Sequence, residues 1–210
     1  MKTNKRQDIL DAYAQAIQEF GIGSASVGKI AAKLDIPPSL IFHYFKNKDE
    51  MTVELAQNVF RACTQSYFVL ERTFENDEKE FVEFIDHVFH IHSRREDQVD
   101  SNVYYTFVHQ TTFNTAIKDL LLSFMWELTD KFAEYLIYYT QKGIINAKEP
   151  YFLAQKLLCL VDGLSYSWMV MERETYFMFA RKLMEDFLQE LSFQGDLNRY
   201  IKPVEMEVQG

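Results

Sequence analysis

The chain of 210 residues is poor in the residues that interrupt helices or cross-link small folds, with only 7 Gly, 4 Pro and 2 Cys. Few glycines and prolines favour long helices joined by short connections. Cys63 and Cys159 lie far apart and lack metal-ligand spacing. We therefore expect two buried thiols in a reducing cytoplasm.

Long apolar runs and enzyme motifs are absent as well. No uncharged apolar stretch approaches the roughly 18 residues that cross a bilayer, and the polar start lacks the apolar segment of a signal peptide. There is no glycine-rich phosphate loop, nucleophile elbow or zinc-protease motif. Carboxylates such as Asp130 and Glu134 have the spacing of a solvated helix face. We therefore expect a cytoplasmic protein that is not an enzyme, with no membrane partner, catalytic residue, metal or cofactor.

The charge is unevenly distributed along the chain. The net charge is −9, yet residues 1–48 contain seven Lys and Arg against four Asp and Glu. The acidic excess therefore lies after residue 48. A modestly positive end on an acidic body orients a protein on a polyanion such as DNA and disfavours non-specific binding elsewhere on its surface.

One segment near the amino terminus has the pattern of two short helices joined by a tight turn. Ser26 is a suitable N-cap for a helix over residues 27–34, whose apolar side chains recur on one face. Asp35 tolerates the left-handed backbone with which that helix must end. Pro37 and Pro38 prevent its continuation and preset the first turn of the next helix. This geometry is a helix-turn-helix, whose second helix enters the DNA major groove.

The second short helix has more apolar residues than one buried face needs, so some of them must point toward a partner. They are Leu40, Ile41, Phe42, Tyr44 and Phe45. Asn47 and Glu50 then form a capping-box pattern that opens a third helix. Lys48 lies in the first turn of that helix, where a cation opposes the helix dipole. A phosphate in front of this terminus would make the lysine favourable.

Residues 5–55 resemble the DNA-binding domain of the TetR family of bacterial regulators. The shared features are a basic start, an amphipathic first helix, a glycine after it and the helix-turn-helix pattern. They are carried by Lys5, Arg6, Ile9, Leu10, Tyr13, Ile17, Phe20, Gly21, Ser26, Val27, Ile30, Ala31, Phe42, His43, Tyr44, Phe45, Asn47 and Lys48. The rest of the chain is similar to the family only in length, helicity and a glycine-containing penultimate helix.

The resemblance implies an all-α fold. It places a three-helix helix-turn-helix DNA-binding domain at residues 1–47 and a helical effector-binding and dimerisation domain at residues 48–210. The implied function is that of a DNA-binding transcriptional regulator, most often a homodimeric repressor on a palindromic double-stranded DNA operator. A small hydrophobic or aromatic effector would release it. The alternative is a DNA-bound regulator that answers to a protein partner, with a filled core and an acidic docking surface.

The resemblance also implies roles for single residues. Ser26 and Lys48 would hold phosphates, and His43 and Tyr44 would hold phosphate or reach the groove edge. The full expected DNA-binding set is Ser26, Lys29, Pro38, Ser39, Phe42, His43, Tyr44 and Lys48. The chain departs from the family pattern because Pro38 replaces a polar reader, Phe42 replaces the usual Tyr, and Gly28 offers no side chain. Apolar contact with thymine methyls and DNA shape should therefore carry much of the specificity.

The periodicity after residue 48 predicts further helices. They run from 48 to about 74, from 76 through 91, in short pieces over 102–115, and from about 116 to 142. The charged stretch 93–100 predicts a loop. Gly143 suits the position after a helix end, and Pro150 suits the first turn of another helix.

The last two helices carry apolar stripes at steps of three and four residues. Such stripes are typical of two antiparallel helices that complete a four-helix bundle with a second subunit. The expected dimer interface is Leu157, Val161, Gly163, Leu164, Trp168, Phe177, Ala180, Met184 and Phe187. Glycine within a helix costs about 1 kcal/mol relative to alanine, which close approach of a partner helix would offset. The alternative is that the stripes only close the core of the monomer.

The middle of the chain is rich in aromatic residues. Several Tyr and Trp side chains around an apolar cavity would form a ligand pocket with a few polar anchors, and the resemblance implies an effector site between these helices. The expected set is Tyr104, Tyr105, Phe107, His109, Phe113, Trp126, Tyr139, Tyr166 and Met169. Any single one of them has an ordinary place in a helical core, so the hypothesis concerns the set.

A histidine cluster invites a metal or haem hypothesis. His87, His90 and His92 lie close to Glu83 and Asp86 in the sequence. His92 falls on a different helix face from the other two, and no cysteine is near. We therefore expect a partly exposed helix face rather than a metal site.

Overall fold

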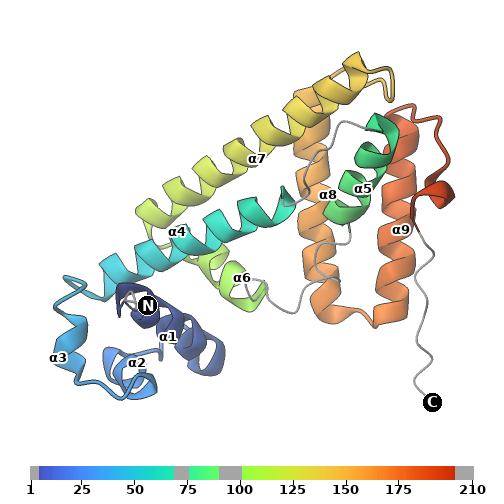
Figure 1. The fold of residues 1–210 in the computed structure, drawn as a ribbon. Helices are drawn as coiled ribbons and strands as arrows, with labels where there is room; N and C mark the ends of the chain where they lie inside the picture. Colours follow the sequence, from blue (N-terminus) through green and yellow to red (C-terminus); the bar gives the residue numbers. More distant parts are fainter. Residues whose placement is uncertain (1–4, 69–75, 90–100, 202–210) are drawn as a thin grey trace. The chain divides into compact units, whose positions relative to one another are not determined.

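The computed structural model describes residues 5–68, 76–89 and 101–201, and its fold in these ranges is all-α (Figure 1), as predicted. The helices are α1 (Lys5–Phe20), α2 (Val27–Lys33), α3 (Pro38–Ile41), α4 (Lys48–Tyr67), α5 (Asp77–Phe89), α6 (Ser101–Gln110), α7 (Thr115–Gln141), α8 (Pro150–Val170) and α9 (Arg173–Glu190), followed by a short 3₁₀ turn at Leu197–Arg199. None of these helices is long and apolar enough to span a membrane.

Local capping explains several helix ends. Asn76 Oδ1 accepts a hydrogen bond from the backbone N–H of Lys79 at 2.9 Å and caps α5. Gly143 follows the end of α7 with a φ of 72°, a left-handed conformation that glycine adopts without steric cost. Pro150 opens α8, where its missing N–H leaves no helical hydrogen bond unmade.

α4 ends at Tyr67, earlier than residue 74, the end expected from the sequence. His87 Nε2 on α5 lies 2.7 Å from the carbonyl oxygen of Ser66 in the last turn of α4. Because a carbonyl only accepts, Nε2 carries the hydrogen and satisfies one of the acceptors that a helix end leaves unpaired. His87 is therefore a structural residue.

The exposure expected for the histidine cluster is corrected at His87. His87 is only 5% exposed, so the expectation of a partly exposed helix face is wrong for this residue. His90 and His92 lie outside the described residues. Within the described ranges, no group of three or more His, Cys, Asp and Glu side chains is arranged to hold a metal ion.

The described helices form two compact units. The first contains α1, α2, α3, α4 up to Cys63, α6, and α7 up to Phe124; the second contains the end of α4, α5, α7 from Met125, α8 and α9. The first unit extends beyond residues 1–47 because α6 also packs against α1. The functional boundary between residues 47 and 48 stays a prediction.

The core of the first unit is built on the inner face of α1. Ile9, Tyr13 and Ala16 on α1 are fully buried together with Ile30 of α2, and each large apolar side chain buried in this way contributes about 1.5–3 kcal/mol. Tyr13 also carries a hydroxyl, which donates to Thr52 Oγ1 at 2.9 Å. Thr52 in turn donates to the carbonyl oxygen of Lys48 at 2.7 Å, so the buried polar groups are paired.

The core of the second unit lies between α5, α7, α8 and α9. α5 packs against both α8 and α9, and α8 packs against α9. Phe81 and Val88 of α5, Leu136 of α7 and Leu157 of α8 are fully buried there. The apolar stripes of the last two helices thus face the core of their own unit.

This placement corrects the expected dimer interface. Six of its nine residues are buried within the monomer, namely Leu157, Val161, Leu164, Ala180, Met184 and Phe187. Trp168 and Phe177 are half-buried against the same core, and Gly163 is exposed. The stripe chosen from the sequence is the seam between α8, α9 and α5. The opposite face of α8 exposes other large side chains, including Phe152 and Tyr166.

The two cysteines differ in their surroundings. Cys63 is partly buried, and burial raises the pKa of its thiol to about 12. Cys159 is exposed on α8, so the expectation of two buried thiols is wrong for this residue. The reason is again the helix period, since Cys159 follows the buried Leu157 by two positions and points to the other face.

Candidate nucleic-acid interface

α2 begins and ends as the sequence predicts. Ser26 has an extended backbone, and its Oγ accepts a hydrogen bond from the N–H of Lys29 at 3.3 Å. Asp35 follows the helix with a φ of 50°. The N–H of Ile36 reaches the carbonyl of Ala31 at 3.1 Å, which is the Schellman arrangement that satisfies the last carbonyls of a helix. The left-handed aspartate therefore turns the chain between α2 and α3.

α3 is a single regular turn, Pro38–Ile41, shorter than the apolar pattern suggests. Beyond it the N–H groups of Tyr44 and Phe45 both bond to the carbonyl of Ile41 at 3.0 Å, so the chain keeps turning through residue 45. Ile41 and Phe45 are buried and anchor residues 38–45, called here the α3 segment, whereas Phe42 is 54% exposed. An exposed aromatic side chain is thus available on the outer face of the second helix.

The structure places six of the eight expected DNA-binding residues at the surface. Ser26, Lys29, Pro38, Ser39, Phe42 and His43 are exposed, and Tyr44 and Lys48 are half-buried. The exposed residues belong to the start of α2 and to α3 with the turn that follows it. These are the two parts of a helix-turn-helix that meet the phosphate backbone and the base edges. Their roles toward DNA stay predictions.

Lys48 is used within the chain. Its Nζ donates to the carbonyl oxygen of Ile22 at 2.9 Å and lies 5.7 Å from the centre of the Tyr13 ring. The first residue of α4 is therefore fastened to the loop between α1 and α2. This contact orients the ammonium group inward, and phosphate binding by Lys48 stays a prediction.

The two lysines of α2 contact the end of α1. Lys33 Nζ pairs with Glu19 at 2.6 Å, which neutralises part of the positive charge counted in this region. Lys29 Nζ lies 3.9 Å from the centre of the Phe20 ring, a cation–π distance. Lys29 thus keeps an unneutralised positive charge at the exposed surface of α2.

The expected effector residues are divided between the two units. Tyr104, Tyr105, Phe107, His109 and Phe113 belong to the first unit, and Trp126, Tyr139, Tyr166 and Met169 belong to the second. Tyr139 and Phe107 are fully buried, whereas Phe113, Trp126, Tyr166 and Met169 are exposed. Binding of an effector by this set stays a prediction.

An aromatic cluster does form in the first unit between α4, α6 and α7. The rings of Phe60 and Phe124 stack with centres 5.4 Å apart. Tyr104 meets them edge-on at 6.0 and 6.3 Å, and Tyr105 lies 5.2 Å from Tyr104. Such edge-to-face and stacked pairs are favourable beyond their buried area. Two of the expected effector residues are therefore part of this cluster.

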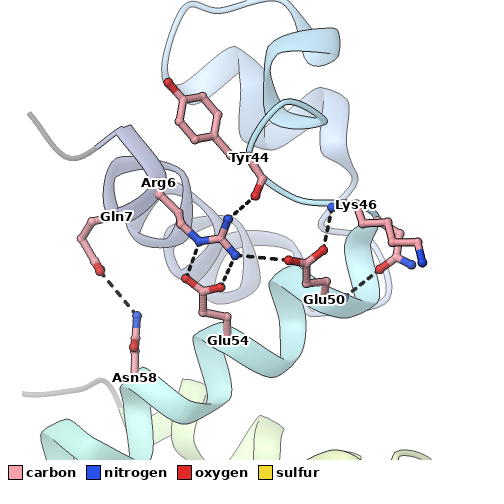
Figure 2. A network of polar contacts seen from close by, with 8 residues as sticks. Arg6, Gln7, Tyr44, Lys46, Glu50, Glu54 and Asn58 are labelled. Atoms are coloured by element: carbon pink, nitrogen blue, oxygen red, sulfur yellow. Dashed lines mark hydrogen bonds and ion pairs between the residues drawn. The ribbon is translucent and has the colours of Figure 1, made fainter.

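Arg6 is a residue whose role the sequence did not indicate. In the sequence it belongs to the basic start of the chain. In the fold its guanidinium joins α1 to α4 and to the end of the α3 segment (Figure 2). A signal existed, because Glu50 and Glu54 stand four residues apart and so share one face of α4. That pattern indicates a carboxylate pair without naming its partner.

Known proteins share these features. Residues 9–55 match the model of the family described as bacterial regulatory proteins, TetR family. The match begins inside α1, contains the whole helix-turn-helix and ends in α4. No curated protein sequence matches the chain significantly.

Solved structures share the fold over nearly the whole chain. A TetR transcription regulator from Haloarcula marismortui is 14% identical, covers 90% of this chain and 98% of its own, and has a TM-score of 0.76. A transcriptional regulator from Saccharomonospora viridis, solved in complex with choline, is 20% identical over 90% of this chain and 97% of its own, with a TM-score of 0.73. The fatty acid degradation regulator FadR from Bacillus halodurans is 18% identical over 92% and 100%, with a TM-score of 0.67.

The helix-turn-helix geometry and the family match thus agree on the same residues. Residues 9–55 therefore form a DNA-binding domain of the type found in the TetR family of bacterial regulatory proteins, and the chain has the fold of solved transcriptional regulators.

Proposed function

We propose that this regulator is a homodimeric repressor that binds a palindromic operator and leaves it when a small hydrophobic or aromatic effector binds. The observation that carries the proposal is the outward face of the α3 segment, where Ser39, Phe42 and His43 are exposed. In a helix-turn-helix, side chains of the second helix contact base edges in the major groove. Readout by this face is the first step of the proposed repression.

The chemistry of this face is mostly apolar. Pro38 and Phe42 offer no hydrogen bond to a base, and Ser39 offers one hydroxyl. An aromatic ring in the major groove suits the methyl group of thymine. We therefore expect an operator whose half-sites place thymine opposite Phe42, with DNA shape supplying further selectivity.

The outer faces of α8 and α9 support the dimer. Phe152, Tyr166 and Val170 on α8 and Met178 and Phe179 on α9 are large side chains exposed to solvent. Large apolar side chains that gather in one exposed patch mark a protein interface. A second copy with the same faces would cover it in a twofold arrangement of four helices. Two helix-turn-helix motifs would then address the two halves of a palindrome.

The aromatic cluster of the first unit supports the effector. Phe60, Tyr104 and Phe124 offer ring faces and a phenol hydroxyl, which suit an apolar, aromatic or quaternary ammonium compound. The related Saccharomonospora viridis regulator was solved with choline. An effector must bind the DNA-competent and DNA-incompetent states differently, typically by about 1–3 kcal/mol, to release the operator.

A protein partner is the second candidate for the controlling signal. α7 exposes Leu122, Met125 and Trp126 at spacings of three and four residues, which is one helix face. An exposed apolar helix face can serve as a docking surface. Release of DNA by a small molecule alone would decide against this candidate.

One experiment tests the proposed function. Purified protein would be mixed with sheared genomic DNA, and the retained fragments would be sequenced and searched for an inverted repeat. We expect that repeat to be retarded with two chains bound, and a copy with one half-site scrambled to bind more weakly. A screen of small apolar compounds should then release it. A chain that stays monomeric at micromolar concentration and retards no inverted repeat at low salt contradicts the proposal.

A further inference from the structure

Arg6 on α1 binds the carboxylate of Glu54 on α4 with two parallel hydrogen bonds (Figure 2). Its Nε donates to one carboxylate oxygen of Glu54 at 2.8 Å, and its Nη2 donates to the other. This fork-to-fork geometry is the strongest and most directional pairing that arginine makes with a carboxylate. The start of α1 is thereby fixed against the second turn of α4.

The same guanidinium reaches the end of the α3 segment. Its Nη1 donates to the backbone carbonyl of Tyr44, and its carbon atom lies 4.2 Å from the centre of the Phe45 ring. The Tyr44 ring itself points away from Arg6 (Figure 2). Arg6 therefore holds the backbone at residues 44 and 45, directly after the exposed Phe42 and His43.

Glu50 completes the arrangement from the side of α4. One carboxylate oxygen accepts from Nη2 of Arg6 at 3.2 Å, and the other accepts from the backbone N–H of Lys46 at 2.7 Å. The N–H of Glu50 donates to Asn47 Oδ1 at 2.8 Å. The expected capping box thus reaches one residue further back than Asn47. Residues 44–47, the last four before α4, are held at both ends.

These contacts occupy the Arg6 guanidinium with partners inside the chain. Hydrogen bonds to Glu54, together with those to Glu50, raise the pKa of the guanidinium above its ordinary value. The hydrogen bond from Lys46 and that from Arg6 lower the pKa of the Glu50 carboxyl. A guanidinium whose charge is shared by two carboxylates is a poor ligand for a DNA phosphate, because binding the phosphate would break these pairs.

We infer that Arg6 is a positioning residue for operator reading. With Glu50 and Glu54 it forms a clamp, Arg6–Glu50–Glu54, that fixes the end of the α3 segment against α1 and α4 and so sets the direction of Phe42 and His43. The inference rests on the proposed operator binding. The clamp requires Glu50 and Glu54 for specific operator affinity. Charge alone would predict the opposite, because acidic side chains near DNA repel its phosphates.

The sign of one substitution separates the clamp from a charge effect. Removing a negative charge near DNA normally strengthens binding, because repulsion from the phosphates decreases. Asp49→Asn removes an exposed acidic side chain in the first turn of α4 that lies outside the clamp, and it should leave operator binding equal or stronger. Glu54→Gln removes the same charge from the clamp. It should weaken specific operator binding about tenfold, through the lost charge-assisted hydrogen bond.

Arg6→Gln gives an independent readout through salt dependence. A lost phosphate ligand decreases the slope of log affinity against log salt by about 0.9. The clamp predicts an unchanged slope, an affinity for the operator about tenfold lower, and unchanged affinity for random duplex DNA. Gln7→Ala is the matched control on α1, because Gln7 also contacts α4, through Asn58 at 3.4 Å, without reaching Tyr44. It should bind the operator like the wild type.

Hydrogen exchange tests the clamp without DNA. The backbone N–H groups of His43, Tyr44 and Phe45 should exchange faster in full-length Glu54→Gln and Arg6→Gln than in the wild type, Asp49→Asn and Gln7→Ala. Equal exchange in all five proteins overturns the inference, as does a Glu54→Gln variant that binds the operator as tightly as Asp49→Asn. If the wild type prefers no inverted repeat, the proposed function fails, and the exchange comparison alone decides for or against the clamp.

Discussion

Lys48 Nζ donates a hydrogen bond to the carbonyl oxygen of Ile22 at 2.9 Å, which fastens the start of α4 to the loop between α1 and α2. The two residues are far apart in sequence and meet only in the folded unit. A residue that family resemblance assigns to phosphate therefore also has a structural contact within the chain. Several substitutions separate such contacts from direct contributions to DNA or partner binding.

Lys48→Met should destabilise the protein by about 1.5–3 kcal/mol, because a hydrogen bond from a charged donor to the Ile22 carbonyl is lost. Urea denaturation of the full chain measures this change. Lys46→Met is the control, since Lys46 is exposed and a surface substitution should stay within about 0.5 kcal/mol. Equal stability of wild type and Lys48→Met would leave phosphate binding as the only role of this lysine.

Phe42→Ala should lower operator affinity with little loss of stability, because the ring is 54% exposed. Uracil lacks the methyl group of thymine, so replacing the contacted thymine by uracil removes about 0.8 kcal/mol, or about fourfold, from wild-type binding. The same replacement should not affect Phe42→Ala. Gel retardation with the four combinations measures the coupling. A uracil effect of equal size in both proteins would show that Phe42 does not read the methyl.

Tyr166→Glu should weaken dimerisation, whereas Leu157→Ala should lower the stability of the fold. Tyr166 is exposed on α8, so a charge there should yield folded monomers that bind an inverted repeat weakly. Leu157 is fully buried, and its truncation should cost about 2–5 kcal/mol. Light scattering after size exclusion and urea denaturation distinguish the two. Dimers of Tyr166→Glu with wild-type affinity would place the interface elsewhere.

Cys159 should react with a thiol reagent at pH 8, whereas Cys63 should not. Burial raises the pKa of Cys63 to about 12, so its nucleophilic thiolate is scarce, and Cys159 is exposed. Mass spectrometry after brief alkylation identifies the labelled residue, and both should react in denaturant. If α8 forms the dimer, labelling of Cys159 should slow as chain concentration rises. Rapid native labelling of Cys63 would contradict the assignment.

Glu50 should make stability depend on pH in the acidic range. Hydrogen bonds from Lys46 and Arg6 lower its pKa in the folded chain below the ordinary 4.5. A lowered carboxyl pKa stabilises the fold above the unfolded value, and this contribution disappears as pH falls through the folded value. Wild type should therefore be more stable than Glu50→Gln at pH 7, and the difference should begin to shrink near pH 4.5 and vanish once the pH is below the lowered pKa. A difference that is independent of pH would exclude the ionised carboxylate as its cause.

The helix-turn-helix was predictable because its causes are local. Ser26 caps α2 through a residue three positions away, Asp35 turns the chain through its own φ, and Pro38 opens α3 at its first turn. The count of apolar side chains predicted that some of them must be exposed, and the family resemblance indicated Phe42 as one of the residues that face DNA. Such effects act over one helical turn and can be read from neighbouring residues.

The end of α4 and the interface could not be predicted in the same way. The last turn of α4 depends on His87, which comes from another helix. On α8, both faces carry apolar residues at helical spacing, and periodicity does not tell which face meets α5 and α9. The folded unit buries Leu157 and leaves Tyr166 exposed, which periodicity alone did not predict.

By itself, then, the amino-acid sequence determined the helical class, the helix-turn-helix and its resemblance to the TetR family, since these depend on caps, turns and a short motif. Tertiary structure alone decided that Arg6 pairs with Glu54, 48 residues away, that Lys48 turns toward Ile22, and that the apolar stripes of α8 and α9 close their own core. The physical reason is that pairing and burial depend on which surfaces meet in space, whereas periodicity and capping depend only on adjacent residues.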